Sequence, residues 1–157
     1  MVQEVWQQPE IITWSQLLLD SYEKLLGHQL IERKDNAQAQ AQALFFAPLV
    51  VASHGTEADP ILNYGNQKAL DLWDMTWDNF TKTPSRMTAE SVNREERKKM
   101  LAQVAKQGFI DNYRGVRIAS TGKRFLIEKA IVWNLFEERD RPCGQGATFS
   151  KWYFLND

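Results

Sequence analysis

The stretch that decides the fold class is FIDNYRGVRIASTGKRFLIEKAIVWNLFE, residues 109–137. It contains two long runs, 109–120 and 123–137, that are rich in β-branched and aromatic residues and meet at the dipeptide Thr121-Gly122. Such runs joined by a tight-turn dipeptide are typical of a β-hairpin. A last strand is predicted over 147–155, after a loop over 139–146 that contains Pro142 and two glycines. The C-terminal third is therefore predicted to be a three-stranded antiparallel meander.

The second strand of this hairpin is apolar on both sides. Simple alternation places one set of side chains on one face and the intervening set on the other. The first set is Ile127, Lys129, Ile131, Trp133 and Leu135, and the second is Leu126, Glu128, Ala130, Val132 and Asn134. Since both sets are largely apolar, we expect both faces of the sheet to be covered.

Two shorter apolar runs precede the hairpin, at 49–53 and 61–64, and each is bounded by turn residues. They predict two buried strands. Between them and the hairpin, Asn66 and Thr76 are placed to cap short helices, and a long polar helix is predicted over 88–107 with residues 94–99 facing water. Strands and helices thus segregate along the chain. The prediction is an α+β fold: a five-stranded antiparallel sheet with helices on one face.

Residues 1–47 are predicted to form an N-terminal helical extension, before a domain over 48–157. Thr13 and Gln16 have the spacing of a capping box, and an apolar stripe follows at helical steps. A second helix is predicted over 36–47, where Gln and Ala alternate. An exposed stripe of this size would be unusual on a monomer. We therefore expect the first helix to cover the outer sheet face, or to form a homodimer.

Composition narrows the class of protein. The chain has 157 residues and a formal net charge of −1, which argues against non-specific nucleic-acid binding. No apolar run is long enough to span a bilayer and no signal peptide is recognisable, so a cytoplasmic protein without membrane contact is expected. The single Cys143 suits a reducing compartment.

Five short strings resemble, in their order along the chain, the MEKHLA domain, a domain with a PAS-like fold that also occurs as free-standing bacterial proteins. The strings are SHGT (53–56), DPILNYGN (59–66), PSRMTA (84–89), YRGVR (113–117) and WNL (133–135). The resemblance implies a sensory or regulatory role, because PAS domains bind small ligands between sheet and helices or pair with other modules. It names no ligand or cofactor. Plant members carry an upstream homeodomain and zipper, so DNA binding is not expected to transfer to this chain.

Large rings with polar neighbours are the best material for a ligand site, although the same rings could simply fill a core. Arg86 is added because an arginine in a loop near a pocket mouth can hold a carboxylate. The candidate ligand-binding residues are Asn63, Tyr64, Trp73, Arg86, Tyr113, Arg117, Trp133 and Asn134.

Other chemistries find less support in the sequence. Ser53, His54 and Asp59 lie where a strand ends in a turn, and turn chemistry explains them better than a catalytic triad does. The two histidines and one cysteine fall short of a zinc site. Cys143 lies in a Pro-Gly loop and not in the Asn-Cys-Arg string of the related flavin photosensors. The resulting hypothesis is a non-enzymatic domain that binds a small organic ligand and signals through a partner protein. The alternative is an interaction or dimerisation module without a ligand.

Overall fold

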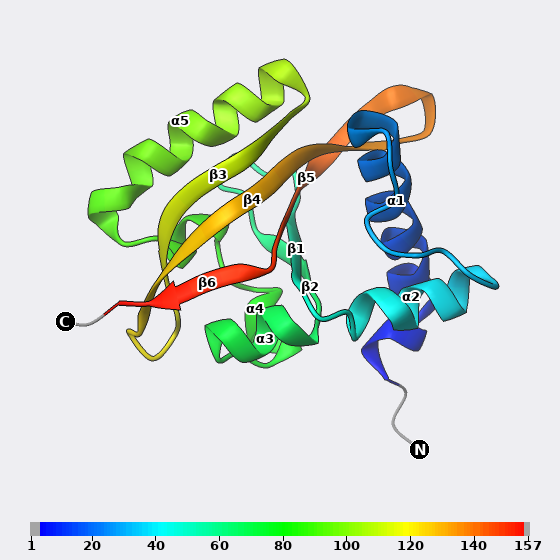
Figure 1. Cartoon of the computed structure of the whole chain (residues 1–157), viewed down its shortest axis with the longest axis horizontal. Coiled ribbons are helices and arrows are strands. Elements are labelled where there is room, and N and C mark those ends of the chain that lie inside the picture. The colour runs from blue at the N-terminus through cyan, green and yellow to red at the C-terminus, as the bar shows by residue number, and fades with distance from the viewer. Residues whose placement is uncertain (1–3, 156–157) are drawn as a thin grey trace.

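The computed structural model describes residues 4–155, apart from the side chains of residues 91 and 92. Its centre is a six-stranded antiparallel sheet in the order β2-β1-β5-β4-β3, with β6 pairing beside β5 on the same edge of β4 (Figure 1). The strands are β1 (Val50–His54), β2 (Leu62–Gly65), β3 (Phe109–Ile118), β4 (Arg124–Glu137), β5 (Arg141–Phe149) and β6 (Lys151–Phe154). The predicted antiparallel α+β class is confirmed.

The predicted count of five strands is wrong, because the last predicted strand is two strands. The segment 139–146, predicted as a loop, lies mostly within β5. β5 contains Pro142, Gly144 and Gly146, which rarely favour a strand. It is nevertheless paired on both sides, with β1 and with β4. Backbone pairing in the middle of the sheet, and not side-chain preference, therefore makes this segment a strand.

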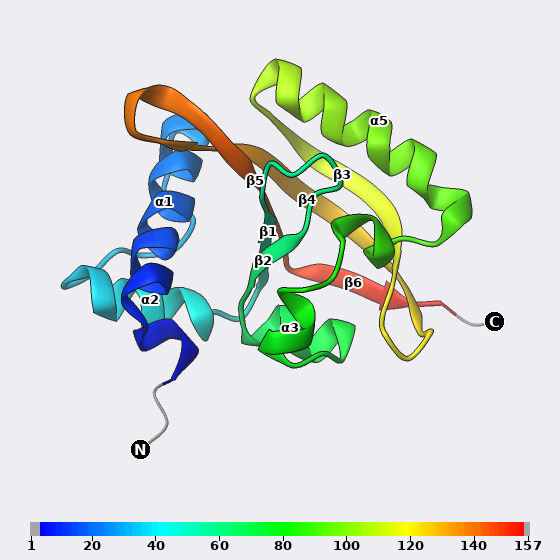
Figure 2. The same cartoon turned by 180° about the vertical axis from the view of Figure 1, so that it is seen from behind.

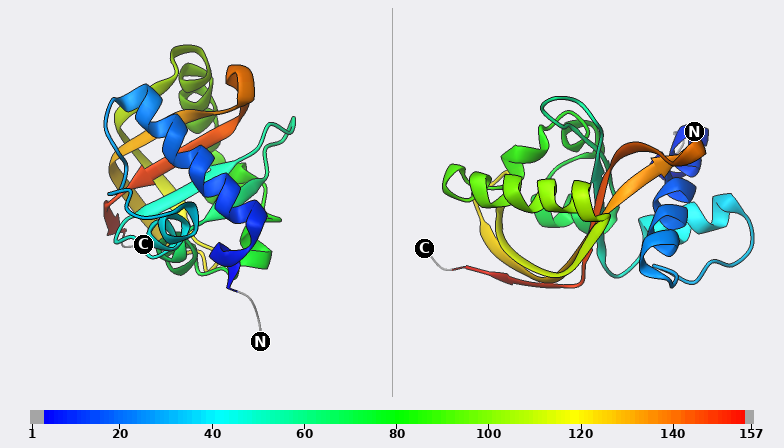
Figure 3. Two further views of the ribbon diagram at one scale, coloured as in Figure 1. Left: turned by 90° about the vertical axis from the view of Figure 1, so that its right-hand side faces the viewer. Right: turned by 90° about the horizontal axis from the view of Figure 1, so that it is seen from above.

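Helices lie on both faces of the sheet: the helices predicted for one face lie there, and the N-terminal helix covers the outer face, as expected. Figure 3 (right) shows α5 and the short helices inside the curve of the sheet, and α1 and α2 on the other side of β1 and β5. Figure 2 shows α5 running alongside β3. The helices are α1 (Pro9–Leu26), α2 (Ala37–Phe45), α3 (Gln67–Trp73), α4 (Trp77–Phe80) and α5 (Ser91–Gln107), with short 3-10 helices at Val5–Gln7, Ser85–Thr88 and Glu138–Asp140.

Helix α1 covers the outer face of its own sheet. Its buried residues include Leu18, Leu19 and Tyr22, and the Tyr22 ring packs edge-on against Trp133 of β4 with 5.1 Å between ring centroids. The backbone N–H of Phe136 donates to the α1 hydroxyl of Ser21 at 3.0 Å. The apolar stripe that raised the homodimer hypothesis is thus largely covered within one chain.

The start of α1 differs from the prediction at Thr13. The helix begins at Pro9, because proline has a fixed φ suited to the first helical position and needs no hydrogen-bond acceptor there. Thr13 therefore lies in the second turn and caps nothing. The helix ends at Leu26 and is capped by Gly27, which has a left-handed φ of 81°.

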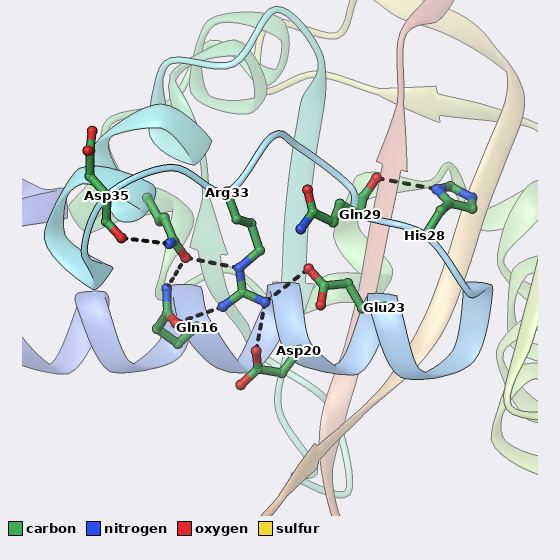
Figure 4. A network of polar contacts seen from close by, with 8 residues as sticks. Gln16, Asp20, Glu23, His28, Gln29, Arg33 and Asp35 are labelled. Carbon is green, nitrogen blue, oxygen red and sulfur yellow. Dashed lines mark hydrogen bonds and ion pairs between the residues drawn. The ribbon is translucent and has the colours of Figure 1, made fainter.

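An arginine attaches the connection between α1 and α2 to α1 (Figure 4). The Arg33 guanidinium donates to Asp20 at 2.8 Å, to Glu23 at 3.0 Å and to Gln16 at 2.7 Å. Its Nε also donates to Gln40 of α2 at 2.9 Å. One side chain therefore links both N-terminal helices, which holds them as a single layer.

Two β-bulges shift the faces of the central hairpin. The pairing of β3 with β4 skips a residue on β3 near Asn112 and one on β4 near Lys129, and both residues have a positive φ, 58° and 55°. Ile127 and Val132 consequently both line the inner cavity, although strict alternation separates them. The predicted alternation over 126–135 is therefore wrong beyond Lys129.

Candidate functional site

A small cavity lies between α5 and the inner face of the sheet, with a volume of about 70 Å³. One part of its wall is apolar and includes Leu62, Trp73, Phe80, Met100, Ile127, Val132 and Phe149. The polar residues that also line it include His54, Ser85, Thr88, Arg97, Tyr113, Arg117 and Gln145. An apolar enclosure with a few polar groups is the usual composition of a ligand site.

Arg97 contributes a buried charge to this cavity. Its side chain comes from the middle of α5, is 8% exposed, and donates a hydrogen bond to the hydroxyl of Ser85. Burial, together with the neighbouring charge of Arg117, lowers the pKa of Arg97 to about 10. The prediction that residues 94–99 all face water is therefore wrong at Arg97. The reason is its helical position, one turn before Met100 and two before Val104, which are both buried.

Arg117 contributes a second buried charge, from β3, and is 6% exposed. It donates to its neighbour's carbonyl, Val116 O, at 2.8 Å and to the Tyr113 hydroxyl at 3.1 Å. The Tyr113 hydroxyl in turn donates to Glu96, an exposed residue of α5, at 2.9 Å. Burial raises the pKa of Tyr113, so the phenol stays a neutral donor.

His54, at the end of β1, is the cavity's neutral acceptor. Burial lowers its pKa, and the charge of Arg97 lowers it further, against the opposing effect of the Gly55 carbonyl. Nδ1 lies 3.0 Å from that carbonyl oxygen, which can only accept, so Nδ1 carries the proton and Nε2 the lone pair. The side chain of Gln145 lies near enough to raise the pKa of the ring, but Nε2 makes no hydrogen bond of normal geometry with the described residues.

Trp73 is a further buried donor at the cavity. Its indole Nε1–H makes no hydrogen bond with the described residues. The ring itself packs against Phe125 at 5.3 Å and Phe149 at 6.1 Å between centroids. Its apolar body is packed while its polar edge has no partner, and the buried indoles of Trp6 and Trp133 share this feature among the described residues.

A larger, open groove adjoins the cavity, with a volume of about 760 Å³. It runs between α5, the β1–β2 connection and the β4–β5 hairpin, and it shares four residues with the cavity: His54, Arg97, Leu101 and Gln145. Its other charged residues are Asp59, Arg86, Arg94, Glu95 and Lys98, and Arg86 pairs with Asp59 at 3.1 Å. The four shared side chains thus form the boundary between the interior and solvent.

Five of the eight sequence-predicted ligand-binding residues lie at these two hollows. Trp73, Tyr113 and Arg117 line the cavity. Arg86 and Asn134 line the groove, where the Asn134 amide donates to the carbonyl of Val104 in α5 at 3.0 Å.

The other three predicted residues lie on the outer side of the sheet, toward α1. Asn63 accepts a hydrogen bond from Ser53 Oγ at 2.6 Å, and Ser53 accepts one from the Trp14 indole of α1 at 2.9 Å. Tyr64 is fully buried, lies beside Ser15 of α1 and packs edge-on against Trp77. Trp133 packs against Tyr22 of α1. The structure does not bring these three residues to the cavity.

The sequence reasoning missed Arg97, His54 and Gln145 as cavity residues. Met100 and Val104 mark the apolar face of α5, and extending this face back by one turn reaches Arg97. His54 and Gln145 directly oppose each other across β1 and β5. That pairing has no signal in the sequence, because the two residues are far apart along the chain.

The comparison with known families now decides the relationship. The family model described as the MEKHLA domain matches residues 12–154. The chain belongs to the MEKHLA domain family. The match includes α1 as well as the sheet, so the outer helix lies within the region that defines the family.

Plant homeobox-leucine zipper proteins are among the similar proteins. The chain is 25% identical to HOX29 of Oryza sativa subsp. indica over 94% of its own length and 17% of that protein's. It is 21% identical to ATHB-15 of Arabidopsis thaliana over 94% of its own length and 18% of that protein's. The MEKHLA chain therefore spans less than a fifth of these plant relatives.

Solved PAS structures share the fold. A PAS domain from Colwellia psychrerythraea superposes with a TM-score of 0.64 at 14% identity, over 73% of this chain and 95% of that one. A light-oxygen-voltage domain, studied with a flavin analogue, superposes with a TM-score of 0.59 at 11% identity, over 76% of this chain and 86% of that one. At these identities the likeness shows the fold alone.

A flavin does not fit the residues of this MEKHLA domain. The cavity of about 70 Å³ is far smaller than the roughly 300–1,000 Å³ of sites for drug-sized ligands. Cys143 is not among the described residues that line it, and burial raises the pKa of this thiol to about 11. Among the described residues no three His, Cys, Asp or Glu side chains gather into a metal site, and no helix is long and apolar enough to cross a membrane.

Proposed function

We propose that this MEKHLA domain is a non-enzymatic sensory or regulatory domain that binds a small organic ligand in its inner cavity and passes the bound state to a partner protein, in the cytoplasm. The observation that carries the proposal is one apolar cavity lined by buried polar and charged side chains, of which Arg97 and Arg117 form no ion pair with a described carboxylate. His54 Nε2 and Trp73 Nε1 make no hydrogen bond with the described residues. Buried polar groups normally have partners, so a ligand that supplies them explains this arrangement.

The geometry supports binding and not catalysis. The Ser53 hydroxyl is directed to Asn63 and Trp14 on the outer side of the sheet, whereas the His54 ring lines the inner cavity. Asp59 pairs with Arg86 in the groove. These three residues therefore do not form a nucleophile, base and orienting acid.

The part of the ligand enclosed by the cavity is small. An engineered cavity of about 150 Å³ takes benzene, so about 70 Å³ has room for roughly half as many heavy atoms. A larger ligand would have to extend past His54 and Arg97 into the adjoining groove.

A route for the signal runs through the sheet to α1. Gly146 of β5 lines the inner cavity, and a Cβ atom at Gly146 would lie 2.8 Å from Trp133 Cζ2, on the outer face. Trp133 in turn packs against Tyr22 of α1. We propose that a shift of β5 on ligand binding moves Trp133, and with it α1.

The experiment is a fragment screen read by the indole N–H signals of the six tryptophans in a ¹H–¹⁵N spectrum. Binders in the cavity should shift the Trp73 indole signal first, because the Trp73 side chain belongs to the cavity lining and its Nε1–H makes no hydrogen bond with the described residues. Ala130→Val adds volume at a fully buried cavity position and should abolish the shifts. Ala119→Val is the matched control, since Ala119 is buried outside the cavity lining. A screen in which no fragment moves Trp73 would contradict ligand binding.

A ligand-free interaction module is the second candidate, and the exposed edge of the sheet favours it. β6 pairs only with β4 among the described strands, and Tyr153 and Phe154 are 53% and 50% exposed. Native mass spectrometry distinguishes the two candidates: retained small-molecule mass favours the sensor, and a ligand-free dimer favours the module.

A further inference from the structure

We infer that the ligand is a short-chain organic carboxylate whose charged group lies between Arg97 and Arg117. This inference rests on the proposed function, because it takes the inner cavity as the ligand site. The two guanidinium groups come from facing elements, α5 and β3, and both line the same cavity. Each is more than nine-tenths buried.

The protein itself provides these two charges with little compensation. No described carboxylate forms an ion pair with Arg97 or Arg117. Asp59 and Glu96 lie near enough to oppose the lowering of the Arg97 pKa, but neither forms an ion pair with it: Glu96 accepts from the Tyr113 hydroxyl, and Asp59 pairs with Arg86. Buried charges are normally paired, because an unpaired one loses its hydration without replacement.

The hydrogen bonds that the protein makes leave donors available. Arg97 donates to the Ser85 hydroxyl, and Arg117 to the Val116 carbonyl and the Tyr113 hydroxyl. A guanidinium has more N–H donors than these neutral acceptors occupy. A carboxylate placed between the two groups would accept from both and would also relieve their mutual repulsion, which lowers the pKa of Arg97.

The remaining walls select an organic acid over an inorganic anion. Trp73, Phe149 and Val132 line the cavity with apolar surface that a carbon chain would cover. The volume of about 70 Å³ has room for about three heavy atoms, so the far end of a longer acid would extend past Arg97 into the adjoining groove. Sulfate or phosphate would satisfy the arginines but would leave this surface without a partner.

The groove provides an approach for an anion. Arg86, Arg94 and Lys98 line it, against Asp59 and Glu95, so its own charges sum to a small positive excess. A cleft with positive charge attracts anionic ligands. Arg97 itself lies on the boundary between groove and cavity, where an entering carboxylate would meet it first.

The test titrates the full chain with propionate and with its neutral isostere propionamide, at constant ionic strength, while the Trp73 indole signal is followed. We expect propionate to bind at least about tenfold more tightly than propionamide, because a hydrogen bond to a charged group is stronger than a neutral one. Arg97→Met and Arg117→Met should each weaken propionate binding by about tenfold or more. Arg114→Met is the matched control, because Arg114 lies on the same strand but is exposed and pairs with Glu128.

A purely structural arginine would behave differently. We expect Arg97→Met to raise the thermal midpoint of the ligand-free protein, since it replaces a buried unpaired charge by an apolar chain of similar length. A lower midpoint together with unchanged propionate binding would overturn the inference. The comparison of propionate with propionamide needs no variant, so it decides even if a variant fails to fold.

The outcomes separate the inference from the proposed function. Equal binding of propionamide and propionate overturns the carboxylate and leaves the ligand-binding sensor standing. If neutral fragments shift the Trp73 indole signal and no carboxylate does, the carboxylate is likewise overturned and the sensor stands. If neither acids, amides nor screened fragments move Trp73, both the inference and the proposed function fail.

Discussion

Replacing Asn66 by aspartate should destabilise the protein strongly, because every hydrogen bond of this buried amide is used. Asn66 is fully buried between β2 and α3. Its Oδ1 accepts from the N–H groups of Val51 and Ala69, both at 3.1 Å. Its Nδ2 donates to the carbonyls of Leu44 at 3.2 Å and Leu49 at 2.8 Å. One side chain thus joins α2, β1 and α3.

Asn66→Asp keeps the shape and removes only the donors. The carbonyl of Leu49 loses the Asn66 donor, the carbonyl of Leu44 keeps only the Ala47 N–H at 3.3 Å, and both face a carboxylate oxygen instead. An unsatisfied buried polar group costs about 1–3 kcal/mol, and more where a charge is involved, so the loss amounts to about 2–6 kcal/mol. The N-terminus of α3 favours a negative charge by up to about 1 kcal/mol and offsets part of this. We expect a loss of about 3 kcal/mol at pH 7.

The loss should depend on pH in a defined direction. Burial and the two carbonyls raise the folded-state pKa of the new carboxyl above its unfolded value of about 3.9. A raised acid pKa means that the folded state binds the proton more tightly, so the penalty grows as pH rises from about 4 to the folded pKa. Below that window the protonated acid can donate to one of the two carbonyls. The variant should therefore be less impaired at pH 5 than at pH 7.

Urea unfolding followed by tryptophan fluorescence, at both pH values, measures this effect. Gln67→Glu is the matched control, because it introduces the same charge at the next residue, which is exposed. We expect the control to change the unfolding free energy by less than about 0.5 kcal/mol. A loss below about 1 kcal/mol for Asn66→Asp at pH 7, or a loss that grows on acidification, would refute the reasoning.

Three further predictions concern packing and reactivity. Leu18→Ala in α1 should cost about 2–5 kcal/mol in urea unfolding, because this leucine is fully buried against the outer sheet face; a cost below 1 kcal/mol would mean that α1 detaches readily. Gly146→Ala should cost about 1–3 kcal/mol and alter tryptophan fluorescence, because the new methyl group would lie 2.8 Å from Trp133 Cζ2; an unchanged spectrum would contradict that contact. Cys143 should react with a disulfide reagent at a rate that still rises with pH at pH 9, since burial raises its pKa to about 11; a plateau near pH 8 would disprove this.

Local signals in the sequence predicted much of the fold. Asn66 and Thr76 both cap helices through their side chains, at 3.1 Å and 3.2 Å from the capped N–H groups. The hairpin turn at Thr121-Gly122 lies between β3 and β4, and Gly122 has a φ of 88°. These features depend on a few adjacent residues, so one sequence is enough to recognise them. The further bonds of Asn66 to α2 depend on tertiary contacts and could not be recognised in this way.

The sequence alone could not predict which face of the sheet each β4 side chain occupies, because β-bulges depend on how the strands pair. Lys129 has a left-handed φ of 55°, which lysine rarely adopts, and no glycine marks the position. The neighbouring strand imposes the extra residue there. The shift directs Trp133 away from the cavity and Val132 toward it. One irregular residue therefore changes which β4 side chains line the candidate site.

Arg97 shows a second limit of prediction from the sequence: a charged residue in a charged segment can still be buried. The residues around it in α5 are charged and largely exposed, so composition favours a solvated face. Only the helical period through Met100 and Val104 places Arg97 inward. A charged side chain at a helical position that faces the core costs folding free energy. Such positions are where a functional role is to be sought.

The abundance of large rings has a structural explanation that limits what it says about function. The ring contacts fall into two groups separated by the sheet. The inner group comprises Trp73, Phe80, Phe125, Phe149, Trp152 and Phe154, and the outer group comprises Trp6, Tyr22, Phe45, Phe46, Tyr64, Trp77 and Trp133. No ring pair among the described residues joins them. A sheet with a core on each face needs rings on both, so aromatic content alone could not distinguish a ligand site from packing. The distinction comes from charged groups instead: Arg97 and Arg117 form no ion pair with a described carboxylate and both lie at the inner cavity, whereas buried indoles without a hydrogen-bond partner among the described residues occur on both sides of the sheet.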